Sequence, residues 1–327
     1  MNFSPLARLS QKTAAAALVL GTLVLSAADQ DPFVKREAPP LAGRWDLKVQ
    51  DGSLEYPSWL EVNLSGYRTL VGSYVGQFGS VRPIGHVQFD DASGQFRFVV
   101  PPQWERRTTP VVFEGKLDGQ ILRGETTNDQ GKTIRWEAHR APSLDRSQPP
   151  KWGKTIPLFN GRDLTGWKAR HSQVKNGWNV EEGRLKNVEP GNDIISERAF
   201  NDFKLHAEFR YPKGSNSGLY LRGRYEVQIE DNYGKPPESH YIGGVYGFLT
   251  PRVNAAKKAG EWQTIDITLV GRVVTVVLNG EPIIERQTIP GITGGALDSQ
   301  EEKPGPIMIQ GDHGPVEFRA LTLTPAE

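Results

Sequence analysis

Carboxylate, guanidinium and phenol side chains alternate with apolar residues along residues 217–231, SGLYLRGRYEVQIED. Successive side chains of a β-strand point to opposite faces, so a strand here would have one apolar and one polar face. The polar face holds Tyr220, Arg222, Arg224, Glu226, Gln228 and Glu230. An acid or base beside cationic groups can move a proton and stabilise the anion that results. We expect a site here, the alternative being a solvated face of cross-strand ion pairs. A turn at Gly223 would change the register of Arg224 and Glu226.

The two glutamates of this face are a candidate pair for conventional glycoside hydrolysis. Retaining enzymes place their carboxyl groups about 5–5.5 Å apart, and inverting enzymes about 6.5–9.5 Å apart. Four residues of strand separate the Cα atoms of Glu226 and Glu230 by roughly 13 Å. The spacing therefore disfavours the two-carboxylate mechanism, which remains an alternative.

A second candidate group follows an apolar strand near the end of the chain, in the segment IQGDHG. This segment holds Gln310, Asp312 and His313. Polar residues in a loop at a strand end are often functional. His313 is a candidate base that Asp312 could orient, and a purely structural hydrogen bond between them is the alternative. In the loop NYGKPPESHYIGGVYGF, Tyr246 offers a ring that can stack on a sugar.

Short β-strands must position these residues, because 35 Gly and 24 Pro punctuate the 327-residue chain. Residues 41–140 contain eight strand candidates and predict a small antiparallel β-barrel or sandwich. The segment 141–153, APSLDRSQPPKWG, is rich in Pro and polar residues and indicates a linker. A second all-β unit follows over residues 154–327. We expect the two units to fold independently.

The N-terminus has the order of a secretory signal peptide. A basic segment with Arg8 and Lys12 precedes an apolar core, and small residues follow at 26–28. We expect residues 1–28 to be removed, residues 29–40 to form a flexible leader, and the mature protein to be periplasmic or extracellular with no membrane span. An uncleaved anchor is the alternative.

Composition excludes several classes of site. The chain has no Cys, which rules out disulfides, thiolate metal sites and a cysteine nucleophile. The net charge is +1 with no long run of one sign, so nothing predicts a nucleic-acid partner.

Five landmarks, in order along residues 154–326, resemble the 3-keto-disaccharide hydrolase family. They are LFNGRDLTGWK, SGLYLRGRYEVQIEDNYG, GEWQTIDI, VVLNG and GPIMIQGDHGPVEFRALTL. The resemblance implies a concanavalin-like β-jelly-roll sandwich whose concave side carries a ligand groove. It would place Leu219, Leu221, Val227 and Ile229 in the core, and the polar residues of that strand in the groove. Residues 41–140 show no such resemblance.

The resemblance also implies a substrate, which is a glycan or 3-keto disaccharide. A ketone at C3 acidifies the proton at C2, so that a base can remove it, the aglycone can leave C1, and water can then add. In this chain Glu226 or His313 would be the base, and Arg222 would stabilise the enolate. Substrate-binding residues would be Tyr220, Arg224, Gln228, Tyr246, Gln310 and Asp312. No His-rich spacing demands a metal, and a divalent metal that replaces an arginine as the electrophile is left open.

A non-catalytic carbohydrate-binding protein is the alternative from another class, because the same fold often only binds glycans. A purely binding groove would favour aromatic residues, Asn and Asp over Arg and Glu, so the composition favours an enzyme. In the N-terminal unit Trp45, Trp59, Trp104 and Trp136 are expected to be mostly core residues, with stacking on a glycan as the alternative.

Overall fold

The computed structural model describes residues 37–327, so the predicted signal peptide at 1–28 and the first part of the leader, 29–36, lie outside the described residues. Within 37–327 every regular element is a β-strand, and all strand pairs are antiparallel. The all-β prediction is confirmed. Over this same range, no helix has the length and apolar character needed to cross a membrane.

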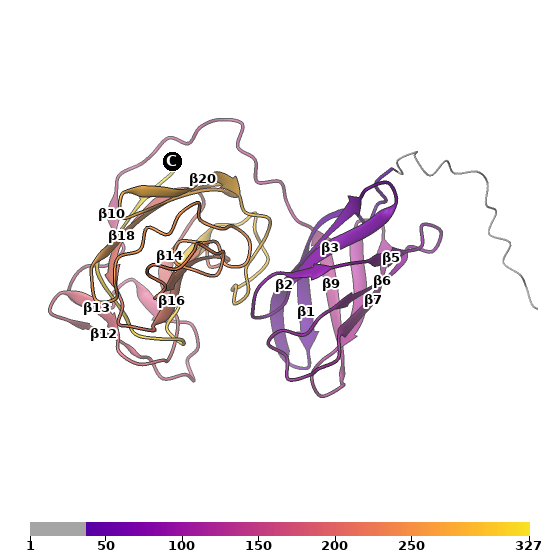
Figure 1. Ribbon diagram of the computed structural model, residues 1–327, viewed down its shortest axis with the longest axis horizontal. Helices are drawn as coiled ribbons and strands as arrows, with labels where there is room; N and C mark the ends of the chain where they lie inside the picture. Colours follow the sequence, from indigo (N-terminus) through magenta and orange to yellow (C-terminus); the bar gives the residue numbers. More distant parts are fainter. Residues whose placement is uncertain (1–36) are drawn as a thin grey trace, which may run out of the picture.

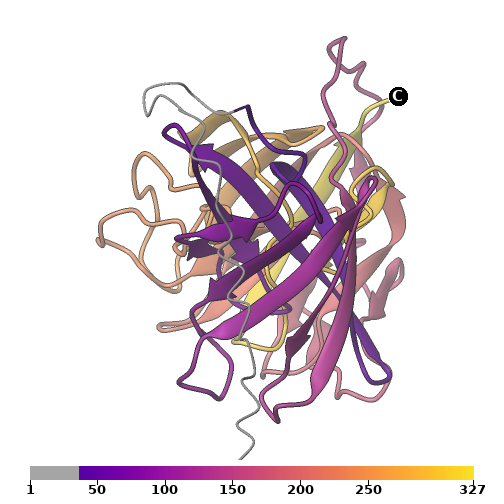
Figure 2. The same cartoon turned by 90° about the vertical axis from the view of Figure 1, so that its right-hand side faces the viewer.

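The first part of the chain forms one nine-stranded antiparallel sheet in the order β4-β3-β2-β1-β9-β8-β7-β6-β5 (Figures 1 and 2). Its strands are β1 (Gly43–Asp51), β2 (Leu54–Ser65), β3 (Thr69–Val75), β4 (Arg82–Ile84), β5 (Val87–Phe89), β6 (Gln95–Val100), β7 (Val111–Asp118), β8 (Ile121–Thr127) and β9 (Thr133–Arg140). Only Gly85 and His86 separate the edge strands β4 and β5 in sequence. The sheet must therefore curl until its two edges meet, which gives a barrel-like unit.

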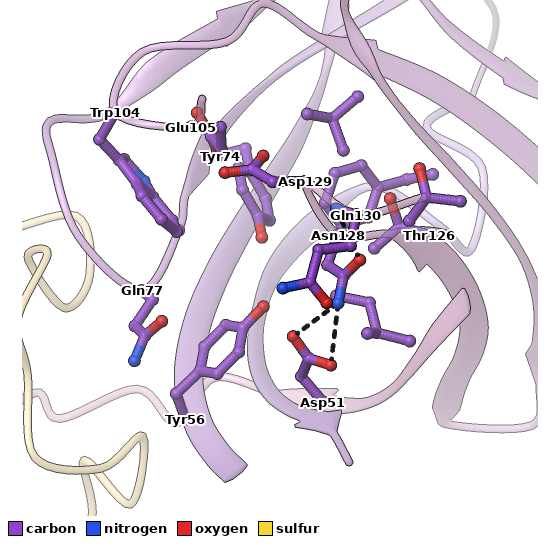
Figure 3. A pocket seen from close by; sticks show the side chains of 15 residues that line it. Asp51, Tyr56, Tyr74, Gln77, Trp104, Glu105, Thr126, Asn128, Asp129 and Gln130 are labelled. Atoms are coloured by element: carbon purple, nitrogen blue, oxygen red, sulfur yellow. Dashed lines mark hydrogen bonds between the residues drawn. The ribbon is translucent and has the colours of Figure 1, made fainter. Parts of the chain in front are cut away.

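Alternate residues of these strands fill the inside of the curled sheet. Trp45 and Trp136 are buried there, and the rings of Phe98 and Phe113 stack with centroids 4.9 Å apart. Trp104 differs, because 39% of it is exposed and it lines a cavity of about 220 Å³ in this unit (Figure 3).

The second part of the chain forms two facing sheets. One has the order β12-β13-β22-β15-β18-β19-β20, with β10 also paired to β22, and the other has the order β11-β14-β21-β16-β17. The strands of the larger sheet are β10 (Ile156–Pro157), β12 (Trp178–Glu181), β13 (Arg184–Asn187), β15 (Phe203–Arg210), β18 (Gln263–Val270), β19 (Val273–Leu278), β20 (Glu281–Thr288) and β22 (Val316–Pro325). Those of the smaller sheet are β11 (Trp167–Ala169), β14 (Ile194–Phe200), β16 (Asn216–Leu221), β17 (Tyr225–Glu230) and β21 (Gly305–Ile309).

One hydrophobic core lies between these two sheets. Phe203, Leu205, Ala207 and Phe209 alternate along β15 and are buried, as the period of a half-buried strand requires. The smaller sheet contributes its own alternate residues, among them Leu219. This arrangement is the predicted jelly-roll sandwich, and the fold class is confirmed.

Packing crosses between the two units although residues 141–153 separate them in sequence (Figure 1). Trp59 and Val75 of the N-terminal sheet belong to the hydrophobic cluster of the sandwich, and the ring of Trp59 meets Phe248 edge-on with centroids 5.4 Å apart. The Ser299 hydroxyl donates to the carbonyl of Leu47 at 3.1 Å. The units therefore share buried surface, and their predicted independent folding remains a prediction.

Candidate active site

The stretch 217–231 is a hairpin of β16 and β17 rather than one strand. Arg222 and Gly223 form its turn, with positive φ angles of 53° and 66°. Tyr220 is paired with Glu226, and Leu221 with Tyr225. Because three residues separate Leu221 from Tyr225, the alternation of faces continues across the turn. Leu219, Leu221, Val227 and Ile229 accordingly point into the sandwich core as predicted.

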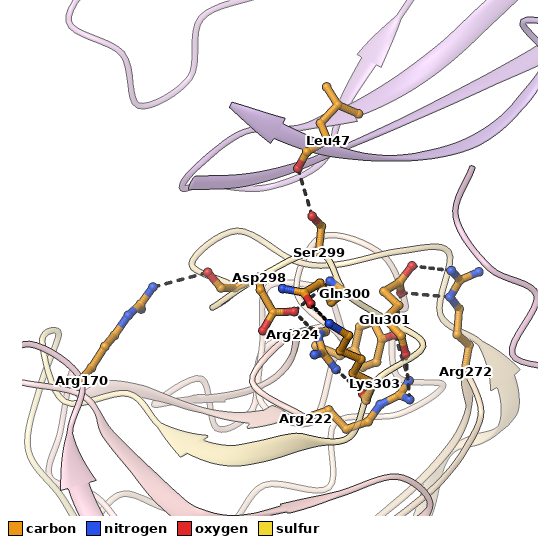
Figure 4. A network of polar contacts seen from close by, with 12 residues as sticks. Leu47, Arg170, Arg222, Arg224, Arg272, Asp298, Ser299, Gln300, Glu301 and Lys303 are labelled. Atoms are coloured by element: carbon orange, nitrogen blue, oxygen red, sulfur yellow. Dashed lines mark hydrogen bonds and ion pairs between the residues drawn. The ribbon is translucent and has the colours of Figure 1, made fainter. Parts of the chain in front are cut away.

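The position of Arg222 in the turn does not fit the catalytic role predicted for it. Its side chain is fully buried, and it donates to the carbonyl oxygens of Glu301 and Gly271 and to the hydroxyl of Tyr225 at 3.0–3.2 Å (Figure 4). It therefore lies at the end of the hairpin and is occupied by structural contacts.

Arg224 is likewise a structural residue rather than a substrate ligand. Its side chain is 2% exposed, it forms an ion pair with Asp298 at 2.7 Å, and it donates to the carbonyl of Lys303 at 2.9 Å. These contacts fasten the segment 289–304 to the hairpin (Figure 4). That segment in turn covers Tyr220 and Glu226.

The buried network around Arg222 reaches the N-terminal unit. Glu301 is fully buried, forms an ion pair with Arg272, and accepts a hydrogen bond of 2.5 Å from Tyr225. Asp46 on β1 hydrogen-bonds to the Glu301 carboxylate. Burial, then the neighbouring Glu301 charge, raises the pKa of Asp46 well above its usual range, so Asp46 is the protonated partner.

Glu226 is the buried carboxyl of the hairpin, with 4% of the residue exposed. Its Oε2 lies 3.0 Å from the hydroxyl of Tyr220, which also lies 2.9 Å from the carbonyl oxygen of Gly294. Burial raises the pKa of Glu226 to about 8. A carboxyl with this pKa is a stronger base than a solvated one and titrates near neutral pH.

Two glycines make room for this pair. A Cβ at Gly218, which pairs with Gln228 across the hairpin, would lie 2.5 Å from Oε1 of Glu226. Gly295 has a φ of 79°, and a Cβ there would lie 2.6 Å from the Tyr220 hydroxyl. Larger residues at either position would push the carboxyl or the phenol out of place.

His313 and Asp312 are the exposed part of the site. Nδ1 of His313 lies 2.5 Å from Oδ1 of Asp312, and about half of each side chain is exposed. The hydrogen bond that His313 donates to the Asp312 carboxylate raises the pKa of His313, and the charge of Glu226 raises it further. His313 in turn lowers the pKa of Glu226. The charges of Glu226, His313 and Asp312 thus act on one another, and their shared catalytic role stays a prediction.

Arg170 and Asp193 belong to the same cluster but were not predicted. They form an ion pair of 2.9 Å in which the two side chains are 18% and 8% exposed. Asp193 also accepts from the backbone N–H of Gly311 at 2.9 Å, which ties the pair to the loop that carries His313. Asp193 raises the pKa of both Glu226 and His313. Arg170 directly follows β11 and Asp193 directly precedes β14, so their position at strand ends was the available signal.

Tyr246 and Gln310 flank Glu226 through their backbones. The N–H of Tyr246 donates to the carbonyl of Glu226 at 3.0 Å, and that of Gln310 donates to the carbonyl of Gly218 at 3.0 Å. Burial and then the charge of Glu226 raise the pKa of Tyr246. The side-chain Oε1 of Gln310 is buried and has no hydrogen-bond partner among residues 37–327.

The predicted open groove along this hairpin is not observed. Tyr220, Glu226 and Gln228 are only 2–4% exposed. Oε1 of Gln228 accepts a hydrogen bond from the N–H of Ile229, which also withdraws Gln228 from its predicted ligand role. The most exposed side chains of the cluster are those of Asp312 and His313.

No group of three or more His, Asp or Glu side chains within residues 37–327 is arranged to hold a metal ion.

Comparison with known proteins places the sandwich in a family. Residues 154–324 match the 3-keto-alpha-glucoside-1,2-lyase-like domain. A 3-keto-disaccharide hydrolase of Bacteroides thetaiotaomicron is 23% identical, over 40% of this chain and 57% of its own length. The chain thus spans a little over half the length of that relative.

Two crystal structures from Parabacteroides distasonis, both described as candidate glycosyl hydrolases, are also similar. The first is 29% identical with a TM-score of 0.43, covering 55% of this chain and 92% of the other. The second is 22% identical with a TM-score of 0.44, covering 53% and 94%. The resemblance seen in the sequence is confirmed by the match over residues 154–324, and the chain belongs to the family of 3-keto-alpha-glucoside-1,2-lyase-like domains.

Proposed function

We propose that this carbohydrate-active, hydrolase- or lyase-like protein cleaves 3-keto glycosides by removing the proton at C2. The electron pair of the C2–H bond forms an enolate with the C3 ketone. When the electron pair of the enolate moves back, it forms the C1–C2 double bond and breaks the bond between C1 and the glycosidic oxygen. The glycosidic oxygen leaves with a proton. Addition of water to C1 and of a proton to C2 would complete net hydrolysis.

The observation that supports this proposal most directly is the buried carboxyl of Glu226, whose pKa is raised to about 8. A base is most effective when its pKa lies near the working pH. Tyr220, 3.0 Å away, stabilises the ionised form by donating to it. Of the two bases considered from the sequence, this favours Glu226.

His313 suits the complementary role of acid. Asp312 raises its pKa, so the imidazolium form extends closer to neutral pH and can donate a proton to the leaving oxygen. The proton lost at C2 and the proton gained by the aglycone would then pass through different residues.

Arg170 takes the place that the sequence suggested for Arg222. It is a permanent cation of this cluster, and its charge acts on both Tyr220 and Asp312. A guanidinium here can offset the negative charge that develops on the enolate oxygen. The segment 289–304 covers Glu226, so a sugar must enter beside the exposed His313 or displace that segment.

A pair of substrates tests the proposal. The purified protein is incubated with a 3-keto glucoside and, separately, with the same glucoside before oxidation, and released aglycone is measured. We expect cleavage of the ketone only. Comparable rates on both compounds would instead indicate a conventional glycoside hydrolase, and binding without cleavage of either would indicate a carbohydrate-binding protein.

A further inference from the structure

The N-terminal unit has a cavity of about 220 Å³ that belongs to no part of the site described above. It lies at one end of the curled sheet, where β1 ends and where the β8–β9 turn and the segments near residues 76 and 104 converge (Figure 3). Its lining is aromatic and polar, with Tyr56, Tyr74 and Trp104 among the aromatic residues and no Lys, Arg or His.

Trp104 forms an exposed aromatic wall of this cavity. It is 39% exposed, whereas Trp45 and Trp136 of the same unit are buried. Phe78 supports it edge-on, with ring centroids 5.5 Å apart and planes at 83°. An indole that is held in place and left open to solvent can stack on an apolar ring face.

Several polar groups of the lining are fixed by the protein itself. The Glu105 carboxylate lies 2.7 Å from Nη1 of the buried Arg82. The side-chain amide of Asn128 donates to both oxygens of Asp51 at 3.2 Å (Figure 3). These contacts position the cavity walls before any ligand arrives.

Other polar groups of the lining have unused hydrogen-bonding capacity. Within residues 37–327, no hydrogen bond engages the side-chain amides of Gln77 and Gln130, the hydroxyl of Tyr56 or Nε1 of Trp104. Amides and hydroxyls both donate and accept, as sugar hydroxyls do. Such groups match a neutral polyhydroxylated ligand.

We propose that this cavity is a sugar-binding site that takes one pyranose ring of a neutral glycan, with Trp104 stacking on the face of the ring. The lining contains three acidic residues and no cationic side chain, which disfavours an anionic ligand. The acidic residues are Asp51, Glu105 and Asp129. At about 30 Å³ per molecule of water, the volume equals roughly seven waters, which suits a single ring rather than a chain. The inference goes beyond the proposed function, because the site lies in the unit outside the family match.

The cavity adjoins the segment that covers Glu226. The carbonyl of Gln77, a lining residue, accepts from the N–H of Gly295 at 2.8 Å. The preceding residue, Gly294, provides the carbonyl that the Tyr220 hydroxyl contacts. Of these two consecutive glycines, Gly295 contacts the cavity lining and Gly294 contacts Tyr220, the hydrogen-bond partner of Glu226. The N-terminal unit can therefore hold a glycan beside the catalytic unit.

Binding can be measured without turnover. Full-length protein carrying Glu226→Gln is titrated with unoxidised methyl glucoside and with a gluco-disaccharide, using calorimetry and tryptophan fluorescence. We expect saturable binding. Adding Trp104→Ala should weaken it at least tenfold, because the stacking surface is lost. Adding Gln130→Ala should weaken it several-fold, and this side chain has no hydrogen bond in the described chain whose loss could disturb folding.

Tyr67→Ala is the matched control, since Tyr67 is an exposed aromatic of the same unit outside the cavity lining. It should leave binding unchanged. Equal sugar binding by the Trp104→Ala and Tyr67→Ala proteins would overturn the proposal. Saturable binding of tetramethylammonium, with no binding of either sugar, would also overturn it. Binding lost with His313→Ala but kept with Trp104→Ala would assign the sugar to the Glu226 site instead. Failure to cleave 3-keto glycosides would overturn only the proposed function, because this titration involves no turnover.

Discussion

The hydroxyl of Tyr220 lies 3.0 Å from Oε2 of Glu226 and 2.9 Å from the carbonyl oxygen of Gly294. A carbonyl only accepts and a phenol has one proton. Protonated Glu226 can therefore donate to Tyr220 while Tyr220 donates to Gly294, and ionised Glu226 can accept from Tyr220 instead. The arrangement satisfies both protonation states of a buried carboxyl, and a general base passes through both states in each turnover.

Tyr220→Phe should raise the pKa of Glu226 further, because it removes the hydrogen bond that stabilises the carboxylate. We expect the limb of the pH profile of kcat/KM that reports Glu226 to move to higher pH, with activity at pH 7 reduced by about tenfold. Rates measured from pH 6 to 10 test this. An unmoved limb would show that Tyr220 does not tune the base.

The wild-type pH profile should be bell-shaped. Activity needs ionised Glu226, whose pKa is raised to about 8, and protonated His313, whose pKa is raised above its ordinary value, so the rate should first rise and then fall with pH. His313→Gln should lower the rate by about 10²–10⁴-fold and remove the falling limb. A falling limb that persists in His313→Gln would assign the acid to another group.

Arg170→Ala and Arg222→Ala should separate catalysis from folding. Arg170 acts on the cluster around Glu226, so its loss should lower kcat strongly, and because its ion pair with Asp193 is partly exposed the melting temperature should fall less than in Arg222→Ala. Loss of Arg222 leaves the buried carbonyls of Glu301 and Gly271 without their donor. It should lower the free energy of unfolding by about 3 kcal/mol. Thermal melts and rates of both variants test this, and the reverse pattern would restore Arg222 as the catalytic cation.

Asp46 should make the contact between the two units sensitive to pH. Its raised pKa means that the protonated form stabilises the folded state. That stability is fully present below the ordinary carboxyl pKa and is lost as the pH rises through the alkaline folded-state pKa. Asp46→Asn keeps a permanent donor toward Glu301, so its melting temperature should increasingly exceed that of the wild type between pH 5 and pH 9. Arg272 and Glu302 also face Asp46. A difference that stays constant with pH would exclude Asp46 as the titrating group.

Export remains a proposal from the sequence, because residues 1–28 lie outside the described chain. N-terminal sequencing of exported material should begin near Asp29, and soluble cytoplasmic protein that retains Met1 would contradict this.

Alternation along residues 217–231 was enough to predict which side chains enter the core, because side-chain period is a local property. It also placed Tyr220 and Glu226 on one face. Gly223 signalled a turn as one possibility, but the turn also requires a left-handed backbone conformation at Arg222, which an arginine rarely adopts and which the local pattern does not signal. Arg222 and Arg224 were therefore assigned to the wrong environment.

Two features of the site arise from contacts between distant parts of the chain. They are the ion pair between Arg170 and Asp193 and the burial of Glu226 under the segment 289–304. Neither has a periodic signal. The same holds for Trp104, whose exposure distinguishes it from Trp45 and Trp136 only once the sheet has curled.

The central claim is that Glu226 removes the proton at C2. A 3-keto glucoside deuterated at C2 is incubated with the wild-type protein and with Glu226→Gln, and the deuterium content of the product is measured by mass spectrometry against an enzyme-free control. We predict that the wild-type product has lost the C2 deuterium to solvent, and that Glu226→Gln, folded and with unchanged melting, forms product about 10²–10⁴-fold more slowly. A wild-type product that retains the deuterium, or a Glu226→Gln protein that turns over at the wild-type rate, would contradict the claim.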